Sequence, residues 1–249
     1  LYKSDQVKRR LHSMMKRLNI EGFVAFARLL EKDPERLKEF RNWLTIHVSE
    51  FFRNPDKFQE LEERILPRLL KGKRGLNVWS AGAANGSEPY SIAIILKELA
   101  PFGNHRILAT DIDKEVLEVA TEGVYEKRDL VNVSPKRLTA FFKPISGEGE
   151  FTLYRISPEV QKLVTFRQHD LLRDPYEEGF DLILCRNVII YFTDKARDEI
   201  FRKFHASLNP GGVLFIGATE SILNAREIGF EVISPFFYRK AIPKMLPRW

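Results

Sequence analysis

The sequence predicts an α/β fold in which a doubly wound parallel sheet follows an N-terminal all-helical domain and carries a small inserted β subdomain. Two patterns support this prediction. From residue 4 to about residue 66 the chain looks wholly helical. From Leu76 onward, short apolar runs alternate with helical patterns, which is typical of parallel sheets covered by helices. With 249 residues, 44% of them hydrophobic, the chain can bury a substantial core.

The N-terminal domain is predicted to contain helices over residues 4–18, 21–30, 34–46 and 56–70. In the first helix, one stripe is apolar and the rest of the surface carries five cations: Lys8, Arg9, Arg10, Lys16 and Arg17. Such a charge run is usually solvated surface, but no acid lies among residues 7–18, which also favours an acidic partner. We place this domain at 1–69 and a polar linker at 70–75.

The second domain, at 76–249, is predicted to hold the sheet. Its strands are expected over residues 76–80, 106–110, 163–168, 180–185 and 213–217, with a closing antiparallel hairpin from 229–233 and 236–240. Residues 124–162 are too many for an ordinary connection between a helix and a strand. Because the run from Phe151 to Ile156 reads as a strand beside a turn at 146–149, we expect the inserted β subdomain there.

A strand, a loop of small residues and a helix follow one another in the stretch N-V-W-S-A-G-A-A-N-G-S-E-P-Y-S-I-A at 77–93. Small residues let a ligand approach the backbone, and the helix beginning near Pro89 turns its free N–H groups toward the loop. Gly82 and Gly86 lie four apart, which is not the spacing of the dinucleotide fingerprint G-x-G-x-x-G. The loop alone is therefore a weak sign of nucleotide binding.

An acid follows the second predicted strand, in the sequence A-T-D-I-D at 109–113. Asp111 at this position can accept both ribose hydroxyls of a nucleoside that is bound across the first loop. Loop and acid together therefore predict an adenosine-type cofactor. The alternative is that Asp111 or Asp113 merely caps the helix predicted from Lys114 to Thr121.

Composition limits the remaining possibilities. The net charge of +6 and the pI near 9.3 favour an acidic partner, which could be nucleic acid, a membrane surface or an acidic protein. No apolar run is long enough to insert into a membrane. The single cysteine, Cys185, excludes a disulfide framework and suits the cytoplasm. The five histidines show no metal-ligand spacing, so no metal is expected.

Five motifs taken together resemble the chemotaxis receptor methyltransferases, the CheR family of class I S-adenosylmethionine-dependent methyltransferases. They are V-S-E-F-F-R-N at 48–54, V-W-S-A-G-A-A-N-G-S-E-P-Y-S-I-A at 78–93, A-T-D-I-D at 109–113, C-R-N-V-I-I-Y-F at 185–192 and L-N-P-G-G at 208–212. The resemblance covers essentially the whole chain. It departs from the family pattern in the loop at 82–87 and at His47, where an asparagine is usual.

The resemblance implies a reaction and a partner. The expected reaction is methyl transfer from S-adenosyl-L-methionine to a glutamate carboxylate on the cytoplasmic helical domain of a chemoreceptor, which leaves S-adenosyl-L-homocysteine. A glutamate is already ionised at neutral pH, so no general base is required. We expect a cytoplasmic monomer that neither binds nucleic acid nor inserts into a membrane.

The resemblance also assigns roles to individual residues. Arg53 and Tyr191 are expected beside the methyl group, and the positive face formed by Arg9, Arg10, Lys16 and Arg17 is expected to meet the receptor. Asp111 would bind the ribose and Glu88 the methionine ammonium, although an acid also suits the first turn of a helix. The full set of expected cofactor contacts is His47, Ser49, Arg53, Ala81, Gly82, Glu88, Asp111, Asp170, Leu171, Arg186 and Asn187.

Two other functions fit the same fold. A nucleic-acid methyltransferase would also use the basic charge, but the sequence has no N-P-P-Y or D-P-P-Y motif and no cysteine in a Pro-Cys loop. A non-catalytic module that senses the cofactor or binds a receptor would keep the fold without the reaction. Transfer of a labelled methyl group to receptor or to nucleic acid separates the three.

Overall fold

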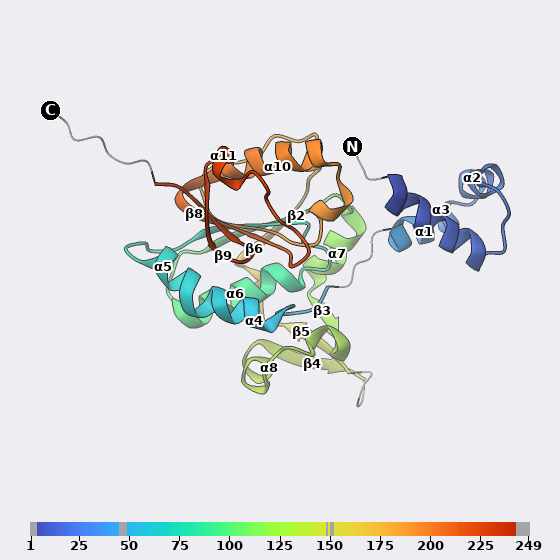
Figure 1. Cartoon of the computed structure of the whole chain (residues 1–249). Coiled ribbons are helices and arrows are strands. Elements are labelled where there is room, and N and C mark those ends of the chain that lie inside the picture. Colours follow the sequence, from blue (N-terminus) through green and yellow to red (C-terminus); the bar gives the residue numbers. More distant parts are fainter. Residues whose placement is uncertain (1–3, 45–48, 148, 150–151, 243–249) are drawn as a thin grey trace. The chain divides into compact units, whose positions relative to one another are not determined.

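The computed structural model describes residues 4–44, 49–147, 149 and 152–242, and it divides into two compact units (Figure 1). The first unit contains the described residues up to 44 together with Tyr191–Arg197. The second contains Ser49–Ile190 and the residues from Asp198 onward. The division falls after residue 48, earlier than the linker that the sequence analysis places at 70–75.

The first unit contains a bundle of the helices α1 (Ser4–Arg17), α2 (Phe23–Lys32) and α3 (Pro34–Leu44), drawn in blue in Figure 1. Its core is formed by Met14 and Met15 of α1 and Phe26 of α2. The ring of Phe26 packs edge-on against Phe40 of α3, with 5.3 Å between ring centroids. These helices lie where helical periodicity predicts them, and the last two residues of the helix predicted at 34–46 lie outside the described residues.

The second unit is built on a seven-stranded sheet with the strand order β6-β2-β1-β7-β8-β10-β9. Its strands are β1 (Asn77–Ala81), β2 (Arg106–Asp111), β6 (Val164–Gln168), β7 (Phe180–Cys185), β8 (Leu208–Ile216), β9 (Phe230–Ser234) and β10 (Phe237–Lys240). The first five strands in this order pair in parallel, and β10 runs antiparallel to both β8 and β9. The predicted doubly wound sheet and its closing hairpin are confirmed.

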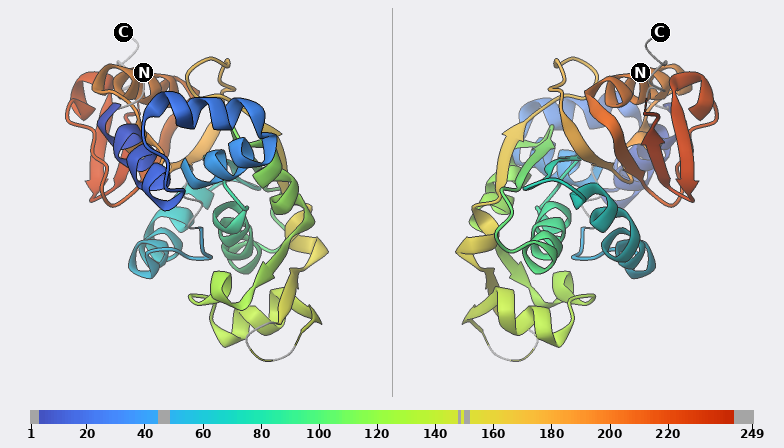
Figure 2. Two further views of the ribbon diagram at one scale, coloured as in Figure 1. Left: turned by 90° about the vertical axis from the view of Figure 1, so that its right-hand side faces the viewer. Right: turned by 90° about the vertical axis from the view of Figure 1, so that its left-hand side faces the viewer.

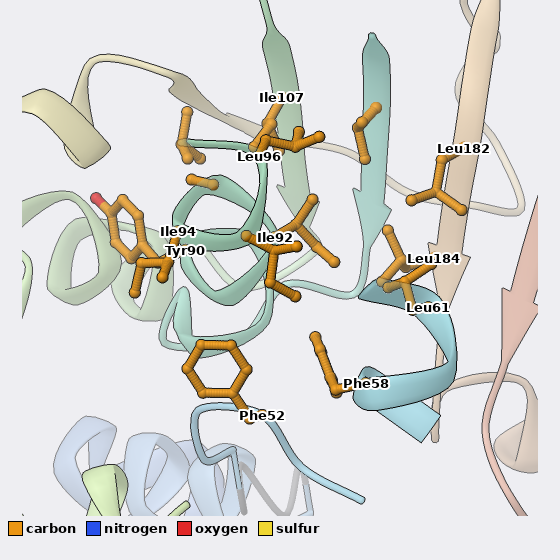
Figure 3. Packing of buried hydrophobic residues seen from close by; sticks show 14 of the residues in the cluster. Phe52, Phe58, Leu61, Tyr90, Ile92, Ile94, Leu96, Ile107, Leu182 and Leu184 are labelled. Carbon is orange, nitrogen blue, oxygen red and sulfur yellow. The ribbon is translucent and has the colours of Figure 1, made fainter. Parts of the chain in front are cut away.

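Helices cover both faces of this sheet (Figures 1 and 2). On one face lies α6 (Ser87–Leu99), and on the other lies α10 (Asp194–Ser207). Neighbouring side chains of a strand point to opposite faces. Val78 therefore joins the core cluster that includes Ile92 of α6, whereas Trp79 contacts Phe204 of α10 at 5.3 Å between ring centroids. Figure 3 shows the α6 side of the core.

Residues 55–70 form a helical segment with a break in its hydrogen-bond pattern. The segment comprises α4 (Pro55–Glu60), a π-helical turn (Leu61–Ile65) and α5 (Leu66–Leu70), where one continuous α-helix was predicted. Pro67 lacks an N–H, so the regular α pattern cannot run through this point. Phe58 and Leu61 belong to the same core cluster as Leu184 of β7 (Figure 3).

The insertion predicted at 124–162 contains a separate three-stranded antiparallel sheet. Its strands β3 (Val124–Glu126), β5 (Leu153–Ile156) and β4 (Phe142–Ser146) lie side by side in that order. The insertion also contains a 3-10 turn (Lys127–Leu130) and the helices α8 (Pro135–Phe141) and α9 (Pro158–Gln161). Two further helices, α7 (Lys114–Glu122) and α11 (Ala225–Ile228), complete the unit. Within the described ranges, none of the helices has the length and apolar character needed to cross a bilayer.

Candidate functional site

Most of the predicted cofactor contacts lie at the carboxyl ends of four neighbouring parallel strands. Ala81 ends β1, Asp111 ends β2, Asp170 follows β6, and Arg186 follows β7. The chain leaves β1 toward β2 and leaves β7 toward β8, in opposite directions across the sheet. Ligands of doubly wound folds bind at such a switch point, where connections diverge beyond the strand ends.

The loop between β1 and α6 contains two glycines with a left-handed backbone, and at one of them, Gly82, there is no room for a side chain. The N–H groups of Gly82 and Ala83 both donate to the carbonyl of Thr110, at 2.8 and 2.9 Å, which fixes the loop against β2. A Cβ on Gly82 would stand 2.3 Å from Val188, and φ is +85° at Gly82 and at Gly86. A side chain at Gly82 is therefore excluded by space and disfavoured by backbone conformation, and at Gly86 the backbone conformation favours glycine.

Asp111 holds this loop and keeps acceptor capacity free. Its Oδ2 accepts from the N–H of Ala84 at 3.0 Å, and its Oδ1 accepts from the N–H of Asp113 at 3.1 Å. A carboxylate has about four acceptor sites, so these two bonds leave sites for ligand hydroxyls. Asp113 instead caps α7, since its Oδ1 accepts from the N–H of Glu115 at 3.0 Å and of Val116 at 3.4 Å. Of the two acids, Asp113 is therefore the helix cap.

Glu88 and Arg186 form an ion pair beside the loop. Glu88, in the first turn of α6, accepts from Ser80 Oγ at 2.8 Å and from Arg186 Nη1 at 3.2 Å. Arg186 Nη2 also donates to the carbonyl of Arg53 at 2.9 Å and to Asn54 Oδ1 at 2.7 Å. Burial lowers the pKa of Arg186, and the Glu88 carboxylate acts in the opposite direction. The pair thereby ties the Arg53 segment to the strand ends.

Glu220, an acid for which the sequence predicts no role, holds the loop after β7. Its carboxylate accepts from the N–H groups of Gly217 at 2.6 Å, Asn187 at 3.1 Å, Ile189 at 2.9 Å and Ile190 at 3.3 Å. Burial raises the pKa of Glu220, and these N–H donors oppose that effect. The only sequence signal was an acid placed shortly after a buried strand, in A-T-E-S at 218–221.

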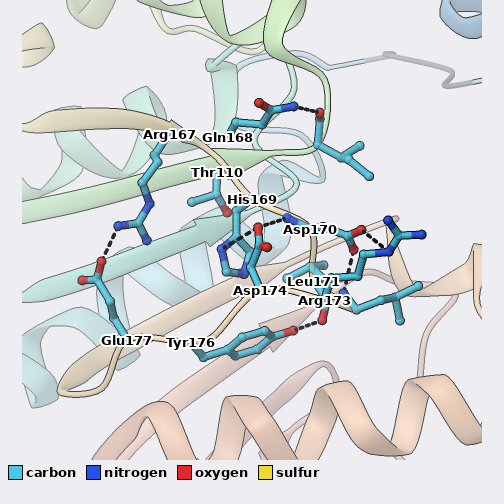
Figure 4. A network of polar contacts seen from close by, with 12 residues as sticks. Thr110, Arg167, Gln168, His169, Asp170, Leu171, Arg173, Asp174, Tyr176 and Glu177 are labelled. Atoms are coloured by element: carbon cyan, nitrogen blue, oxygen red, sulfur yellow. Dashed lines mark hydrogen bonds and ion pairs between the residues drawn. The ribbon is translucent and has the colours of Figure 1, made fainter.

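The segment after β6 is organised by a chain of polar contacts, shown in Figure 4. The N–H of His169 donates to the carbonyl of Asp111 at 2.9 Å, which joins the β6 segment to the end of β2. Asp170 Oδ1 accepts from the N–H of Leu172 at 2.8 Å, and the Asp170 N–H donates to Asp174 Oδ2 at 2.8 Å. The predicted contacts Asp170 and Leu171 therefore lie in an ordered turn next to Asp111.

Several predicted residues fall elsewhere. His47 lies outside the described residues, and Ser49 is half-buried near the start of the second unit. Tyr191 ends the 3-10 turn Ile189–Tyr191, directly after Ile190, whose N–H donates to Glu220. Cys185 is fully buried, and burial raises the pKa of its thiol, so it does not present a thiolate nucleophile. Across the described ranges, no cluster of His, Cys, Asp or Glu could hold a metal ion.

The four cations predicted to meet a receptor lie on α1 of the first unit. Arg9 and Arg10 belong to the middle of this helix, and Lys16 and Arg17 are exposed in its last turn. Arg17 forms an ion pair with Glu39 of α3. The acid-free stretch at 7–18 therefore does not describe the whole surface, because a neighbouring helix supplies a carboxylate.

Comparison with known proteins gives the family. Residues 1–45 match the family model for the all-alpha domain of CheR methyltransferases, and residues 47–235 match the model for their SAM-binding domain. The chemotaxis protein methyltransferase of Listeria monocytogenes is 44% identical over 242 residues, which cover 96% of this chain and 90% of that protein. The chemotaxis protein methyltransferase of Salmonella typhimurium is 37% identical over 230 residues, which cover 90% of this chain and 78% of that protein.

Proposed function

This chain belongs to the CheR family of S-adenosylmethionine-dependent methyltransferases, and we propose that it methylates glutamate side chains of chemoreceptors. The acceptor is the γ-carboxylate of a glutamate on the cytoplasmic helical domain of the receptor, so the enzyme acts in the cytoplasm. The products are a glutamate methyl ester and S-adenosylhomocysteine. The observation that supports this most is the pair of carboxylates, Glu88 and Asp111, on either side of a loop that excludes a side chain at Gly82.

The residues at the strand ends suit S-adenosylmethionine. Glu88 offers a mostly buried carboxylate to the ammonium group of the methionine part, and its side chain is 15% exposed. Asp111 has free acceptor sites for the two ribose hydroxyls. Asp170 and Leu171 lie in the turn next to Asp111, where they would contact the adenine. A Cβ at Gly82 would meet the side chain of Val188, so the glycine lets Val188 pack closely against the loop.

The chemistry asks little of the protein. Bound S-adenosylmethionine supplies an electrophilic methyl group on a positively charged sulfur. A glutamate with a pKa near 4.3 is ionised at neutral pH, so the chain need not supply a general base. Arg53 and Tyr191 would orient the acceptor carboxylate in line with the methyl group, in a site from which water is excluded. A cation and a phenolic O–H are both suited to binding a carboxylate.

Receptor recognition is assigned to the first unit. We propose that Arg9, Arg10, Lys16 and Arg17 of α1 attract an acidic receptor helix, and that a single copy of the chain suffices for the reaction. Positive charge on one side of a helix steers an acidic partner during approach. The exposed positions of Lys16 and Arg17 support this proposal.

The test is transfer of the labelled methyl group from S-adenosylmethionine to receptor and, in parallel, to nucleic acid. We expect label in receptor alone, as an ester that mild base hydrolyses. Arg53→Ala and Tyr191→Phe should reduce kcat by on the order of 10²-fold and 10-fold, with little change in unfolding free energy. Label in nucleic acid would contradict the proposal. Cofactor binding without label in either acceptor would identify a sensing module, and wild-type rates in both variants would refute the catalytic assignment.

A further inference from the structure

Arg53 lies in a segment, residues 51–54, in which both neighbours of the arginine have a left-handed backbone conformation. Phe52 has φ of +53° and Asn54 has φ of +62°, in the left-handed region that residues with side chains rarely adopt. For a bulky residue such as Phe52 this conformation costs about 1–3 kcal/mol and persists only where the surrounding structure enforces it, whereas asparagine adopts it more readily. The contacts that hold this segment are therefore part of how Arg53 is placed.

The inserted β subdomain supplies the contacts of Phe51. The N–H of Phe51 donates to the carbonyl of Asp129 at 3.0 Å. Its ring packs edge-on against Tyr125 of β3 and Phe142 of β4, with 4.7 and 5.1 Å between ring centroids. The Phe51 side chain is fully buried. The residue two positions before Arg53 is thus enclosed by an element that is far from it in the sequence.

Arg137, in α8 of the same subdomain, contacts the next residue. Its guanidinium lies 4.7 Å from the centre of the Phe52 ring. The same group donates from Nη2 to Glu62 of the π-helical turn at 2.7 Å and to Glu98 of α6 at 2.6 Å. From the other side, Ser91 of α6 accepts from the Phe52 N–H at 3.0 Å. Arg137 therefore links the subdomain, the π-helical turn and α6 around Phe52.

We propose that the inserted β subdomain is a positioning element for Arg53, and that Arg137 is the residue through which it acts. The subdomain fixes Phe51 and Phe52, while Arg186 fixes the Arg53 carbonyl and Asn54. The segment is held from both ends, and these contacts restrict the backbone of the arginine between them. The inference rests on the proposed role of Arg53 in methyl transfer, and it does not require the subdomain to touch either substrate.

A double-mutant cycle on kcat tests the inference. Arg137→Met is made in the wild-type chain and in the Arg53→Ala chain, and kcat is measured with saturating receptor and S-adenosylmethionine. Displacing a catalytic group can lower kcat by about 10²-fold. For the partial displacement caused by Arg137→Met in the wild-type background, we expect kcat to fall by about 10-fold. In the Arg53→Ala background the same change should cost less than about twofold, because the group it positions is absent.

The controls separate positioning from folding. Arg128→Met removes an exposed cation of the same subdomain, which pairs with Glu126, and should leave kcat unchanged. Thermal unfolding confirms that every variant is folded at the assay temperature. If Arg137→Met does not fold, Arg137→Lys replaces it, since lysine keeps the charge but lacks the planar fork that binds two carboxylates.

Equal losses in both backgrounds, or no loss in either, would overturn the positioning role while leaving the proposed function intact. An Arg53→Ala enzyme with wild-type kcat is a different result. It would overturn the catalytic role of Arg53, and the positioning inference with it.

Discussion

The Glu88 carboxylate lies 3.2 Å from the Arg186 guanidinium, and the two side chains are only 15% and 3% exposed. Glu88 and Arg186 are 98 positions apart in the sequence. The same guanidinium also donates to the carbonyl of Arg53, which is 133 positions from Arg186. Arg186 also lies over the rings of Phe58 and Phe215, at 5.3 and 4.6 Å from their centres. One cation thus joins α6, the end of β7 and the segment that contains Arg53 and Asn54.

Arg186→Leu should lower the free energy of unfolding by about 3–5 kcal/mol, because it leaves the Glu88 carboxylate buried without its cation. Urea denaturation measures the change. The control is Arg167→Leu, which breaks an ion pair with Glu177 whose side chains are 47% and 49% exposed. Such a surface pair contributes about 1 kcal/mol or less. Equal effects of the two substitutions would mean that the Glu88–Arg186 pair contributes no more than a surface contact.

Asp111→Ala should weaken the binding of S-adenosylhomocysteine by roughly 1.5–3 kcal/mol, the scale of a lost charged hydrogen bond. Isothermal titration calorimetry measures the affinity. Asp113→Ala is the matched control, since it removes the cap of α7 and should cost about 1 kcal/mol of stability without loss of affinity. If Asp111→Ala bound the product as tightly as the wild type, Asp111 would not be a ribose ligand.

The sequence predicted the sheet well because each strand is a short apolar run with its own boundaries. The position of Asp111 was predicted for a similar reason, since the end of a strand locates an acid at the edge of the sheet. Which of Asp111 and Asp113 caps the helix could be decided only from the structure. The two acids lie within two residues of one another in the sequence, and only their hydrogen bonds differ.

Contacts between distant segments could not be predicted in this way. Nothing near Glu220 in the sequence indicates that its carboxylate would collect four N–H groups, three of them from residues about 30 positions away. The role of Asn54 was hidden for the same reason, since its partner Arg186 follows β7. The π-helical turn at Leu61–Ile65 was also not predicted, although Pro67 in the sequence indicates a break in the helix.

His169 should make stability depend on pH. Burial lowers the pKa of His169 below 6.5, and the neighbours Arg167 and Lys203 act in the same direction, while Asp174 and Asp170 oppose them. Below about pH 6.5 the unfolded chain binds a proton at this residue that the folded chain does not, so stability falls as the pH falls toward the lower native pKa. For one proton the slope is at most about 1.4 kcal/mol per pH unit.

Chemical denaturation of the wild type and of His169→Gln at pH 7.5 and pH 5.5 measures this effect. The difference in unfolding free energy between the two proteins should be smaller at pH 5.5, since only the wild type loses the contribution of a neutral His169. His205, whose pKa burial also lowers, is present in both proteins and cancels in the comparison. A difference that does not change with pH would show that His169 is not the titrating group.

Charge reversal on α1 should weaken receptor binding without touching the cofactor site. We expect Arg9, Arg10, Lys16 and Arg17 changed together to Glu to raise the KM for receptor, to flatten its dependence on ionic strength and to leave the affinity for S-adenosylhomocysteine unchanged. Added salt should reduce the difference in KM between the wild type and the variant, because the Debye length is about 10 Å at 0.1 M and the charges are screened. Steady-state kinetics at low and at moderate salt measure both effects.

The ion pair between Arg17 and Glu39 complicates the four-residue variant, since Arg17→Glu would place two carboxylates together and could destabilise the bundle. A variant with only Arg9, Arg10 and Lys16 changed to Glu avoids this and should still raise the KM. Its control reverses three exposed cations of the second unit, Lys71, Arg74 and Arg106, and so changes the net charge by the same amount. If this control raises the KM as much as the α1 variant does, net charge alone attracts the receptor. If neither variant changes the KM at low salt, α1 presents only solvated surface, and receptor recognition must be sought in the insertion at 124–162.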